Sequence, residues 1–572
     1  MKYLSPTLNY TKIKPLVLLY ITLIAFYSCK NKTQKRGLIT EKAMVVSARI
    51  EASNIGKQIL KQGGNAFDAM AATQLALAVA YPYAGNIGGG GFMVYRLKNG
   101  DIGSLDFREK APALATKNMY LDSLGNVIPN LSTRGALAVG VPGSIAGVFE
   151  THKKFGALPI ETIMKPVIAL AKKGVIVTKK QETRIKEKLE DFALANKDTI
   201  LFAKAWKAND TIKYPNLAKT LSRIMQHGPD EFYKGKTATI LAQFIQDNGG
   251  IITVEDLANY KAKWRTPITF KYDDLNIISM APPSSGGIAL AQILKSVEPY
   301  NLGEFGHNSV KTIHLIAEAE RRAYADRSHY LGDPDFVTIP QDKLISNNYL
   351  SNRMSNVSFD TITPSSSISH GAIDIVESDE TTHYSIVDQF GNAVSVTTTL
   401  NSGFGSKLFC EELGFFLNNE MDDFSSKPGV PNVYGLIGAE ANAILPKKRM
   451  LSSMTPTIVE KNDKLYMVVG TPGGSTIITS VMQTILNVHE FNMTMQNAVN
   501  APRFHHQWLP DEIRMEPHRF SKEIITKLEQ KGHRINEERS PVIGIVDAIL
   551  VLPNGKLEGG ADNRGDDAAS GF

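Results

Sequence analysis

The stretch 377–401 constrains the fold of this 572-residue chain more than any other stretch. Two runs of β-prone residues, one alternating and one rich in Val and Thr, flank the loop 389–391. The loop is three residues long and ends in glycine, which suits the left-handed position of a β-hairpin. Centring the hairpin on Phe390 sets Thr381 opposite Thr399. We therefore predict an antiparallel hairpin that begins with two facing threonine hydroxyls.

This pair of threonines has two interpretations. Cross-strand threonine pairs commonly do no more than stabilise a sheet. Asp379 and Glu380 come directly before the first strand, however, and Asn401 follows the second, so polar groups collect at this end of the hairpin. The catalytic interpretation therefore depends on what the rest of the chain supplies.

Composition excludes several classes of function. A hydrophobic content of 43% and a charged content of 21% are those of an ordinary globular protein. The net charge of +6 is spread without a dense block of Lys and Arg, which argues against a nucleic-acid-binding protein. The only cysteines are Cys29 and Cys410, so neither a disulfide framework nor a cysteine-rich metal site is expected. Cys410 is predicted to be a lone buried thiol.

The N-terminus predicts export. Lysines precede an apolar run from Leu16 to Phe26 that is too short for a comfortable membrane span, and Cys29 follows a serine. A cysteine after a small residue resembles a bacterial lipoprotein signal, which implies lipidation of Cys29 and a place in the periplasm or cell envelope. Residues 1–29 would be the signal and 30–42 a polar tether. Plain cleavage and an uncleaved anchor are the alternatives.

Helical patterns dominate the region before the hairpin. Residues 45–64 are predicted to form a helix that ends at a Gly-Gly pair, and Asn65 is predicted to cap a second helix, 66–80, which is apolar nearly all round and hence buried. The glycine run 88–91 precedes an apolar strand, but no Lys-Ser or Lys-Thr pair follows it, so a phosphate-binding loop is excluded. Arg108 lies between acidic residues, and a surface ion pair is its default interpretation.

After the hairpin, a strand–turn–helix unit stands out. Residues 456–460 and 464–470 are predicted to be paired strands, and Gly473 and Gly474 lie in the turn before a helix over 476–487. Such a helix start points backbone N–H groups at an anion. Neighbouring His505 and His506 would face opposite sides of a strand, so a shared metal is not expected. The segment 427–439, which contains Tyr434, has the proline and glycine content of a surface lid.

Together these stretches resemble the gamma-glutamyltranspeptidases, a family of N-terminal nucleophile hydrolases, from about Ala43 to Phe572. The motifs that carry the resemblance are 63–66, 88–92, 106–109, 282–287, 325–327, 381–384, 418–424, 451–454, 471–475 and 501–504. Each motif is weak alone, but their order is highly specific. The resemblance implies an α/β fold, a four-layer αββα sandwich, and a precursor that cuts itself between Glu380 and Thr381. A large subunit, 43–380, and a small catalytic subunit, 381–572, would then stay together in one domain.

The resemblance also implies roles for single residues. Thr381 would be the nucleophile, with its free amine as the base and Thr399 hydrogen-bonded to its hydroxyl. Gly473 and Gly474 would hold the oxyanion through their backbone N–H groups. The group transferred is a γ-glutamyl group, which carries an α-carboxylate and an α-ammonium. The carboxylate would bind Arg108, Ser452 and Ser453, the ammonium would bind Asn401, Glu420 and Asp423, and Tyr434 would belong to a lid over the site.

The implied activity is that of a gamma-glutamyltransferase and glutathione hydrolase. The donor would be glutathione or a related γ-glutamyl amide, the acceptor would be water, an amino acid or a dipeptide, and neither a metal nor an organic cofactor is expected. Two other interpretations stay open. One is a cephalosporin or glutaryl acylase of the same architecture, although such an acyl group would leave Glu420 and Asp423 without an ammonium to bind. The other is an inactive, lipid-anchored binding protein that is never cut.

Overall fold

The hairpin forms the centre of a β-sheet. In the computed structural model, which describes residues 34–369, 381–427, 439–539 and 541–572, β10 (Thr382–Val387) pairs antiparallel with β11 (Ala393–Thr399). Thr382 lies opposite Thr398, a register that continues to Thr381 opposite Thr399 as predicted. Gly391 takes a φ of 91° in the loop, which is the left-handed conformation that the turn requires.

Two antiparallel sheets of seven strands each form the two middle layers. Sheet 1 contains, in spatial order, β21 (Ala568–Gly571), β2 (Met44–Ser47), β10, β11, β3 (Gly90–Arg96), β4 (Ile102–Asp106) and β7 (Lys263–Arg265). Sheet 2 contains β1 (Ile39–Thr40), β20 (Leu557–Ala561), β19 (Asp547–Val551), β15 (Lys464–Gly470), β14 (Thr457–Lys461), β9 (Leu275–Ser279) and β8 (Ile268–Tyr272). Alternate side chains of both sheets, among them Val46, Phe92, Ile458 and Val468, form a buried apolar layer between them.

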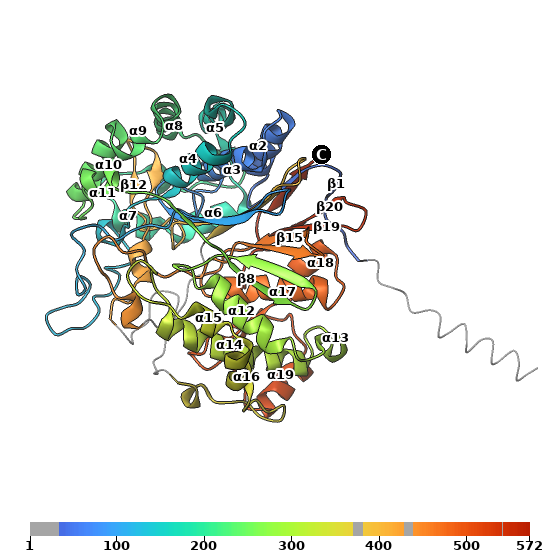
Figure 1. Cartoon of the computed structure of the whole chain (residues 1–572). Coiled ribbons are helices and arrows are strands. Elements are labelled where there is room, and N and C mark those ends of the chain that lie inside the picture. Colours follow the sequence, from blue (N-terminus) through green and yellow to red (C-terminus); the bar gives the residue numbers. More distant parts are fainter. Residues whose placement is uncertain (1–33, 370–380, 428–438, 540) are drawn as a thin grey trace, which may run out of the picture. The chain divides into compact units, whose positions relative to one another are not determined.

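Helices cover the outer face of each sheet, as Figure 1 shows. Helices α2 (Ile50–Lys61), α3 (Ala66–Ala80), α4 (Ser144–Phe155), α5 (Ile160–Lys173) and α8 (Pro215–His227) pack on the side of sheet 1. Helices α12 (Gly286–Val297), α14 (Val310–Tyr330), α17 (Thr476–His489) and α18 (Met495–Asn500) pack on the side of sheet 2. The predicted four-layer αββα sandwich is therefore confirmed.

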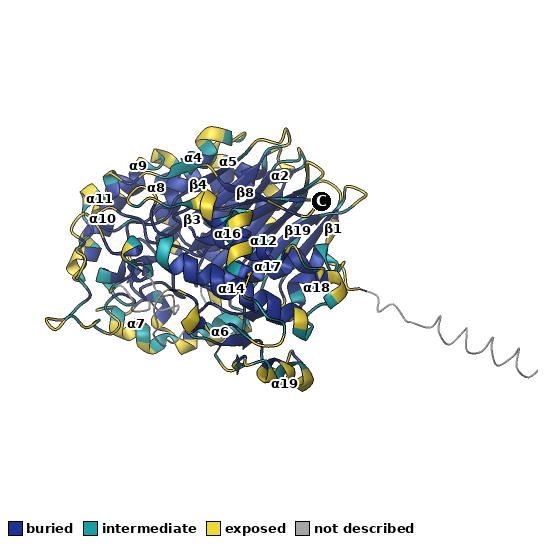
Figure 2. Ribbon diagram, turned by 60° about the horizontal axis from the view of Figure 1, so that its bottom comes forward, coloured by how far each residue is buried: buried dark blue, intermediate teal, exposed yellow. Residues whose placement is uncertain are grey.

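Shorter elements complete the chain. The remaining helices are α6 (Lys179–Glu187), α7 (Leu189–Ala195), α9 (Asp230–Tyr233), α10 (Lys236–Asp247), α11 (Val254–Ala258), α13 (Leu302–Phe305), α15 (Gln341–Leu344), α16 (Asn347–Met354) and α19 (Lys522–Gln530). The remaining strands are β5 (Val175–Ile176), β6 (Thr211–Ile212), β12 (Phe409–Cys410), β13 (Phe415–Phe416), β16 (Phe504–His505), β17 (Ile513–Met515) and β18 (Ile535–Asn536). Figure 2 shows that exposed residues gather on outer helices such as α10 and α19, while the sheets are buried.

The two predicted N-terminal helices had different outcomes. Helix α3 has the predicted bounds, all of its residues are buried, and Asn65 caps it by accepting hydrogen bonds from two backbone N–H groups of the first turn. The prediction of a helix over 45–64 was wrong at its start, because Met44–Ser47 is strand β2 and the helix begins at Ile50. Strand β2 lies between β10 and β21. Pairing with two neighbouring strands thus overrides the local pattern.

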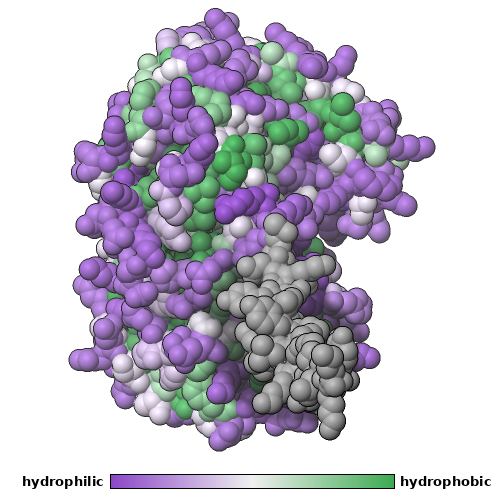
Figure 3. Space-filling model, turned by 90° about the vertical axis from the view of Figure 1, so that its right-hand side faces the viewer, coloured by the Kyte–Doolittle hydropathy of each residue, from purple (hydrophilic) through white to green (hydrophobic). Residues whose placement is uncertain are grey.

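The chain from Arg36 to Phe572 forms one compact unit. Cys410 is a buried free thiol, as predicted. On the face shown in Figure 3, hydrophilic side chains cover most of the surface and hydrophobic ones lie in smaller patches between them. Among the residues that the structure describes, no helix combines the length and the apolar character needed to cross a bilayer.

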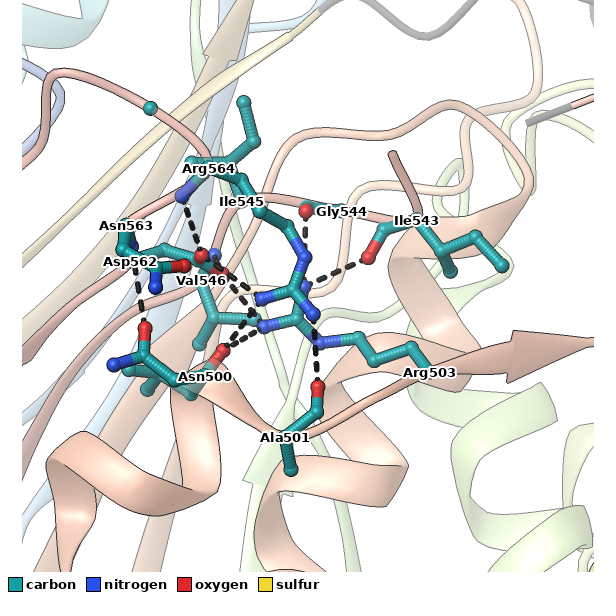
Figure 4. A network of polar contacts seen from close by, with 12 residues as sticks. Asn500, Ala501, Arg503, Ile543, Gly544, Ile545, Val546, Asp562, Asn563 and Arg564 are labelled. Atoms are coloured by element: carbon teal, nitrogen blue, oxygen red, sulfur yellow. Dashed lines mark hydrogen bonds and ion pairs between the residues drawn. The ribbon is translucent and has the colours of Figure 1, made fainter. Parts of the chain in front are cut away.

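Hydrogen bonds from a buried arginine hold the loop 543–545, which lies beside the turn 471–475. Arg503 donates to the backbone oxygens of Ile543 and Gly544 at 2.7 and 2.9 Å and to the Asp562 carboxylate at 2.6 Å, as Figure 4 shows. The next residue, Ile545, donates its amide to Thr471 Oγ1 at 2.7 Å. The network therefore fixes the position from which the turn leaves β15.

Candidate active site

One pocket collects most of the residues that the sequence singled out. Its lining consists of Arg108, Arg327, Thr381, Thr399, Asn401, Glu420, Asp423, Ser452, Ser453, Met454, Gly474 and Ile477, around an empty volume of about 290 Å³ that includes open solvent. Of the predicted site residues, Gly473 is not itself in this lining, but it directly precedes the lining residue Gly474. The remaining ones, Cys29, Glu380 and Tyr434, lie outside the described residues.

Thr381 directly precedes β10 and lines the pocket. It is 5% exposed, and it lines the pocket together with Thr399. Thr399 Oγ1 accepts a hydrogen bond from the Asn401 amide at 2.7 Å, where Asn401 turns the backbone with a φ of 71°. Within the described chain, the expected hydrogen bond between the hydroxyls of Thr381 and Thr399 is not formed. Because Thr399 accepts from Asn401, its own proton remains free to be donated toward Thr381.

The turn between β15 and α17 presents two backbone N–H groups. Gly473 and Gly474 have φ values of 137° and 51°, which L side chains rarely adopt. A Cβ on Gly473 would lie 2.4 Å from Thr476 Oγ1, so only glycine fits there. Neither amide donates a hydrogen bond within the described chain. The turn can therefore stabilise an oxygen that develops negative charge beside Thr381.

Arg108 is not on the surface, so its default interpretation as a surface ion pair was wrong. It is 1% exposed, and its guanidinium donates to Glu420 through Nη1 and to Asp423 through Nη2. Burial disfavours the charged guanidinium, but the carboxylates of Glu420, Asp423 and Glu109 outweigh burial and raise the pKa of Arg108. The predicted binder of the carboxylate, Arg108, therefore pairs with two of the predicted binders of the ammonium.

Two of these acids lie close together in the protein interior. Burial raises the pKa of Glu109 to about 7 and that of Glu420 well above its usual range, with Arg108 opposing both shifts. Glu109 lies 3.7 Å from Arg108 Nη1, and neither of its carboxylate oxygens has a hydrogen-bond partner in the described chain. At neutral pH this pair of carboxyls therefore retains a proton that an exposed pair would lose.

Two serine hydroxyls in the pocket are oriented by other donors. Ser452 Oγ accepts from the Met454 amide at 3.1 Å, and Ser453 Oγ accepts from Arg327 Nη2 at 3.1 Å. An oxygen that accepts from a stronger donor keeps its own proton for another partner. Both hydroxyls can thus donate to an anion in the pocket. Arg327 also lines the pocket but was not among the predicted site residues. Its place in the motif 325–327 was the sequence feature that could have indicated it.

The neighbouring histidines His505 and His506 have different hydrogen-bond partners. His505 bonds Thr479 and Gln507, whereas His506 bonds Asp511 and Arg321. The only described group with suitable spacing for a metal ion is Asp273, Asp274 and His489, whose carboxylates are exposed. Clusters of exposed acids are common without a metal.

Comparison with known proteins gives one consistent result. The sequence profile of the gamma-glutamyltranspeptidase family matches residues 52–572. The chain is 46% identical over 537 residues to the glutathione hydrolase proenzyme of Escherichia coli (strain K12), which covers 93% of this chain and 92% of that protein. Its fold is similar to the crystal structure of a cephalosporin acylase from Bacillus halodurans, with a TM-score of 0.83, 25% identity, and coverage of 95% and 98% of the two chains. A crystal structure of Helicobacter pylori gamma-glutamyltranspeptidase matches with a TM-score of 0.55 and 44% identity over 59% of this chain and 96% of that one.

Proposed function

The chain belongs to the gamma-glutamyltranspeptidase family, and from that premise we propose that Thr381 first cuts the chain and then carries the γ-glutamyl group of glutathione as an ester. The enzyme is a glutathione hydrolase and γ-glutamyltransferase. The single observation that carries the assignment to this site is that Thr381 shares one pocket with the two guanidiniums, the acids and the glycine turn.

The first reaction is self-cleavage. The Thr381 hydroxyl attacks the carbonyl carbon of Glu380, the C–N bond breaks as the acyl group moves from nitrogen to oxygen, and water hydrolyses the resulting ester. The products are a carboxylate at Glu380 and a free amine at Thr381. The large subunit, 43–380, and the small subunit, 381–572, then remain together because β10 and β11 pair with strands β2 and β3 of the other subunit.

The second reaction is transfer. The free amine of Thr381 takes the hydroxyl proton, and an α-amine pKa of about 7.7–8.0 leaves a useful unprotonated fraction near neutral pH. The oxygen then attacks the γ-carbonyl, whose developing charge is stabilised by the amides of Gly473 and Gly474. The amine product leaves with the proton, for example as Cys-Gly from glutathione. Water, an amino acid or a dipeptide then takes the γ-glutamyl group from the ester.

Recognition of the substrate exchanges one set of ion pairs for another. The α-ammonium binds Glu420, Asp423 and Asn401, while the α-carboxylate binds Arg108 and the two serine hydroxyls. Because Arg108 already pairs with Glu420 and Asp423, the zwitterion exchanges its own charges for the ion pairs that these three side chains form with one another. This arrangement favours a zwitterionic head group over one with a single charge.

A matched pair of variants tests the assignment of the nucleophile. Thr381→Val removes the hydroxyl with little change in shape and should abolish both the cut and turnover. Thr382→Val makes the same change one residue later, where the buried Oγ1 has no hydrogen-bond partner in the described chain, and should leave both unchanged. Intact mass and N-terminal sequencing report the cut, and release of p-nitroaniline from γ-glutamyl-p-nitroanilide reports turnover. A Thr381→Val protein that is still cut before residue 381 would exclude this mechanism.

An acylase activity is the second candidate, favoured by the similarity to the cephalosporin acylase fold. The buried acids Glu420 and Asp423 argue against it, because a glutaryl group brings no ammonium to them. Comparing γ-glutamyl- with glutaryl-p-nitroanilide separates the candidates. We expect the former to be preferred by at least tenfold, since losing one charge-assisted hydrogen bond costs about 1.5–3 kcal/mol.

The location of the enzyme is a separate proposal that rests on the sequence. Export, lipidation of Cys29 and a periplasmic or envelope location follow from the pattern of residues 1–29, with 30–42 as a tether. Cys29→Ser should move the enzyme from the membrane fraction to the soluble fraction. Retention of the variant in the membrane fraction would favour an uncleaved anchor instead.

A further inference from the structure

A second arginine lines the pocket without an assigned role. Arg327 comes from the last turn of α14, is 3% exposed, and lies in the same pocket wall as Thr381 and Ser453. Its Nε donates to Ser285 Oγ at 2.9 Å, and its Nη2 donates to Ser453 Oγ at 3.1 Å. Its side chain therefore reaches from the helix layer to the substrate pocket.

Arg327 differs from the other buried arginines nearby because none of the described carboxylates lies within ion-pair distance of it, although Asp423 is near enough to favour its charge. Arg321 and Arg322 on the same helix both pair with Glu318, and Arg108 pairs with two acids across the pocket. Arg327 forms no ion pair with any carboxylate of the described residues. Burial lowers the pKa of Arg327 to about 10, so the guanidinium still carries its charge at neutral pH. Asp423, which pairs with Arg108, favours the charge of Arg327 but only partly offsets its burial, so a further anion in the pocket would stabilise this cation.

The arrangement around Arg327 indicates where such an anion would bind. The backbone oxygens of Met450 and Leu451 face Arg108 at 3.4 and 3.5 Å, and the next residues along the chain are the two serines. Arg327 holds the far end of this segment through Ser453. The segment 450–453 thus lies between two guanidiniums, with both serine protons available for an anion.

The balance of formal charge points the same way. The acids that line the pocket are Glu420 and Asp423, and the cations are Arg108 and Arg327. Without Arg327 the lining would hold Arg108 alone, which already donates to both acids, and would offer no second cation to an anionic head group. Arg108 forms ion pairs with both acids, whereas Arg327 interacts with Asp423 only at longer range, so Arg327 is the cation more available to the ligand.

We propose that Arg327 is a specificity-determining residue of this pocket: it supplies the second positive charge for the α-carboxylate of the γ-glutamyl group and orients the Ser453 hydroxyl to donate to that carboxylate. This inference rests on the proposed function and adds a residue to it. The α-ammonium is recognised by Glu420 and Asp423, and Arg327 forms no hydrogen bond or ion pair with either of them, although Asp423 favours its charge. Loss of Arg327 should therefore weaken only ligands that carry the carboxylate.

Three amides that differ in one charge each provide the test. γ-Glutamyl-p-nitroanilide carries both charges, glutaryl-p-nitroanilide keeps only the carboxylate, and 4-aminobutyryl-p-nitroanilide keeps only the ammonium. For Arg327→Gln we expect kcat/KM to fall about 10- to 100-fold for the first two amides, mainly through KM, and to stay within about threefold for the third. Inhibition constants of glutamate, glutarate and 4-aminobutyrate should show the same division without depending on turnover.

Two further variants separate binding from folding. Arg322→Gln removes a buried guanidinium from the same helix outside the pocket lining, and should change all three amides equally or not at all. Arg327→Lys keeps the charge without the forked donors and should restore part of the loss for the carboxylate-bearing ligands. Both proteins are first checked for the cut before Thr381 by intact mass. If Arg327→Gln is not cut, Arg327→Lys serves in its place: we expect its kcat/KM to fall for the two amides that carry the carboxylate, by a smaller factor, and to stay nearly unchanged for the third.

The outcomes are distinguishable from one another. Equal losses for all three amides, in whichever Arg327 variant is cut, would show that the residue is only structural and would overturn the inference. An unchanged KM for γ-glutamyl-p-nitroanilide in Arg327→Gln would also overturn it. Failure of the unmodified enzyme to release p-nitroaniline from that amide would instead contradict the proposed function itself.

Discussion

Replacing Arg108 by lysine should separate substrate binding from chemistry. The guanidinium donates to Glu420 and to Asp423 with different nitrogens. A lysine has one nitrogen in place of this fork, so it cannot form two parallel hydrogen bonds to one carboxylate. Each charge-assisted hydrogen bond is worth about 1.5–3 kcal/mol. One lost contact to the α-carboxylate therefore predicts a KM for γ-glutamyl-p-nitroanilide that is roughly 10- to 100-fold higher.

The change should appear in KM and not in kcat, because the carboxylate is held in the ground state and in the transition state alike. Initial rates of p-nitroaniline release over a range of substrate concentrations give both constants. The same preparation should be fully cut, since the self-cleavage reaction does not use a free α-carboxylate. A KM that stays within twofold of the unmodified enzyme would remove Arg108 from the binding site.

A stability measurement checks the structural half of this reasoning. Arg108→Met leaves two buried carboxylates without their cation, and breaking a buried pair in this way costs about 3–5 kcal/mol. Adding Glu420→Gln to that variant removes one of the stranded acids, so part of the lost stability should return while binding stays weak. Urea unfolding of the single and double variants measures both effects. Strictly additive losses would contradict the coupling between the two side chains.

Three further changes follow from the geometry. Gly473→Ala places a Cβ 2.4 Å from Thr476 Oγ1 and should lower kcat by about 100-fold or more, with a smaller effect on KM, as measured with γ-glutamyl-p-nitroanilide; an unchanged kcat would exclude the turn as the oxyanion site. Burial raises the pKa of Glu109 to about 7, so the folded state keeps a proton that the unfolded chain loses near pH 4.3, and this group makes the protein less stable as pH rises between those values. Glu109→Gln should therefore flatten the fall of Tm between pH 5 and 7, and an unaltered pH profile would contradict the shift. Asn65→Ala removes the cap of α3 and should cost about 1 kcal/mol in urea unfolding with kcat unchanged.

The parts of the fold that local rules determine were predicted from the sequence. The register of the hairpin follows from loop length and one glycine, and the bounds of α3 follow from its cap and its apolar run. Residues 45–47 were not predicted as a strand because their partners, β10 and β21, come hundreds of residues later. No local pattern reports such pairing.

The candidate site was predicted mainly through resemblance, and its electrostatics only from the structure. The local sequence gives Arg108 two acidic neighbours and favours a surface position, whereas its main partners lie more than 300 positions away. Arg327 was missed for a related reason. Charged residues on a helix usually face solvent, and only the packing of α14 against both α12 and α16 shows that these are buried.

The strand order of sheet 1 has a consequence for the proposed cut before Thr381. From one edge to the other, strands that follow residue 381 and strands that precede it alternate: β21, then β2, then β10 and β11, then β3, β4 and β7. If the two parts were made as separate polypeptides, neither could form a continuous sheet. The part before residue 381 would lack β10 and β11 between β2 and β3, and the part after it would lack β2 between β21 and β10. For the proposed cut before Thr381 we therefore expect the uncut precursor to be the unit that folds, with the peptide bond broken only after sheet 1 has formed.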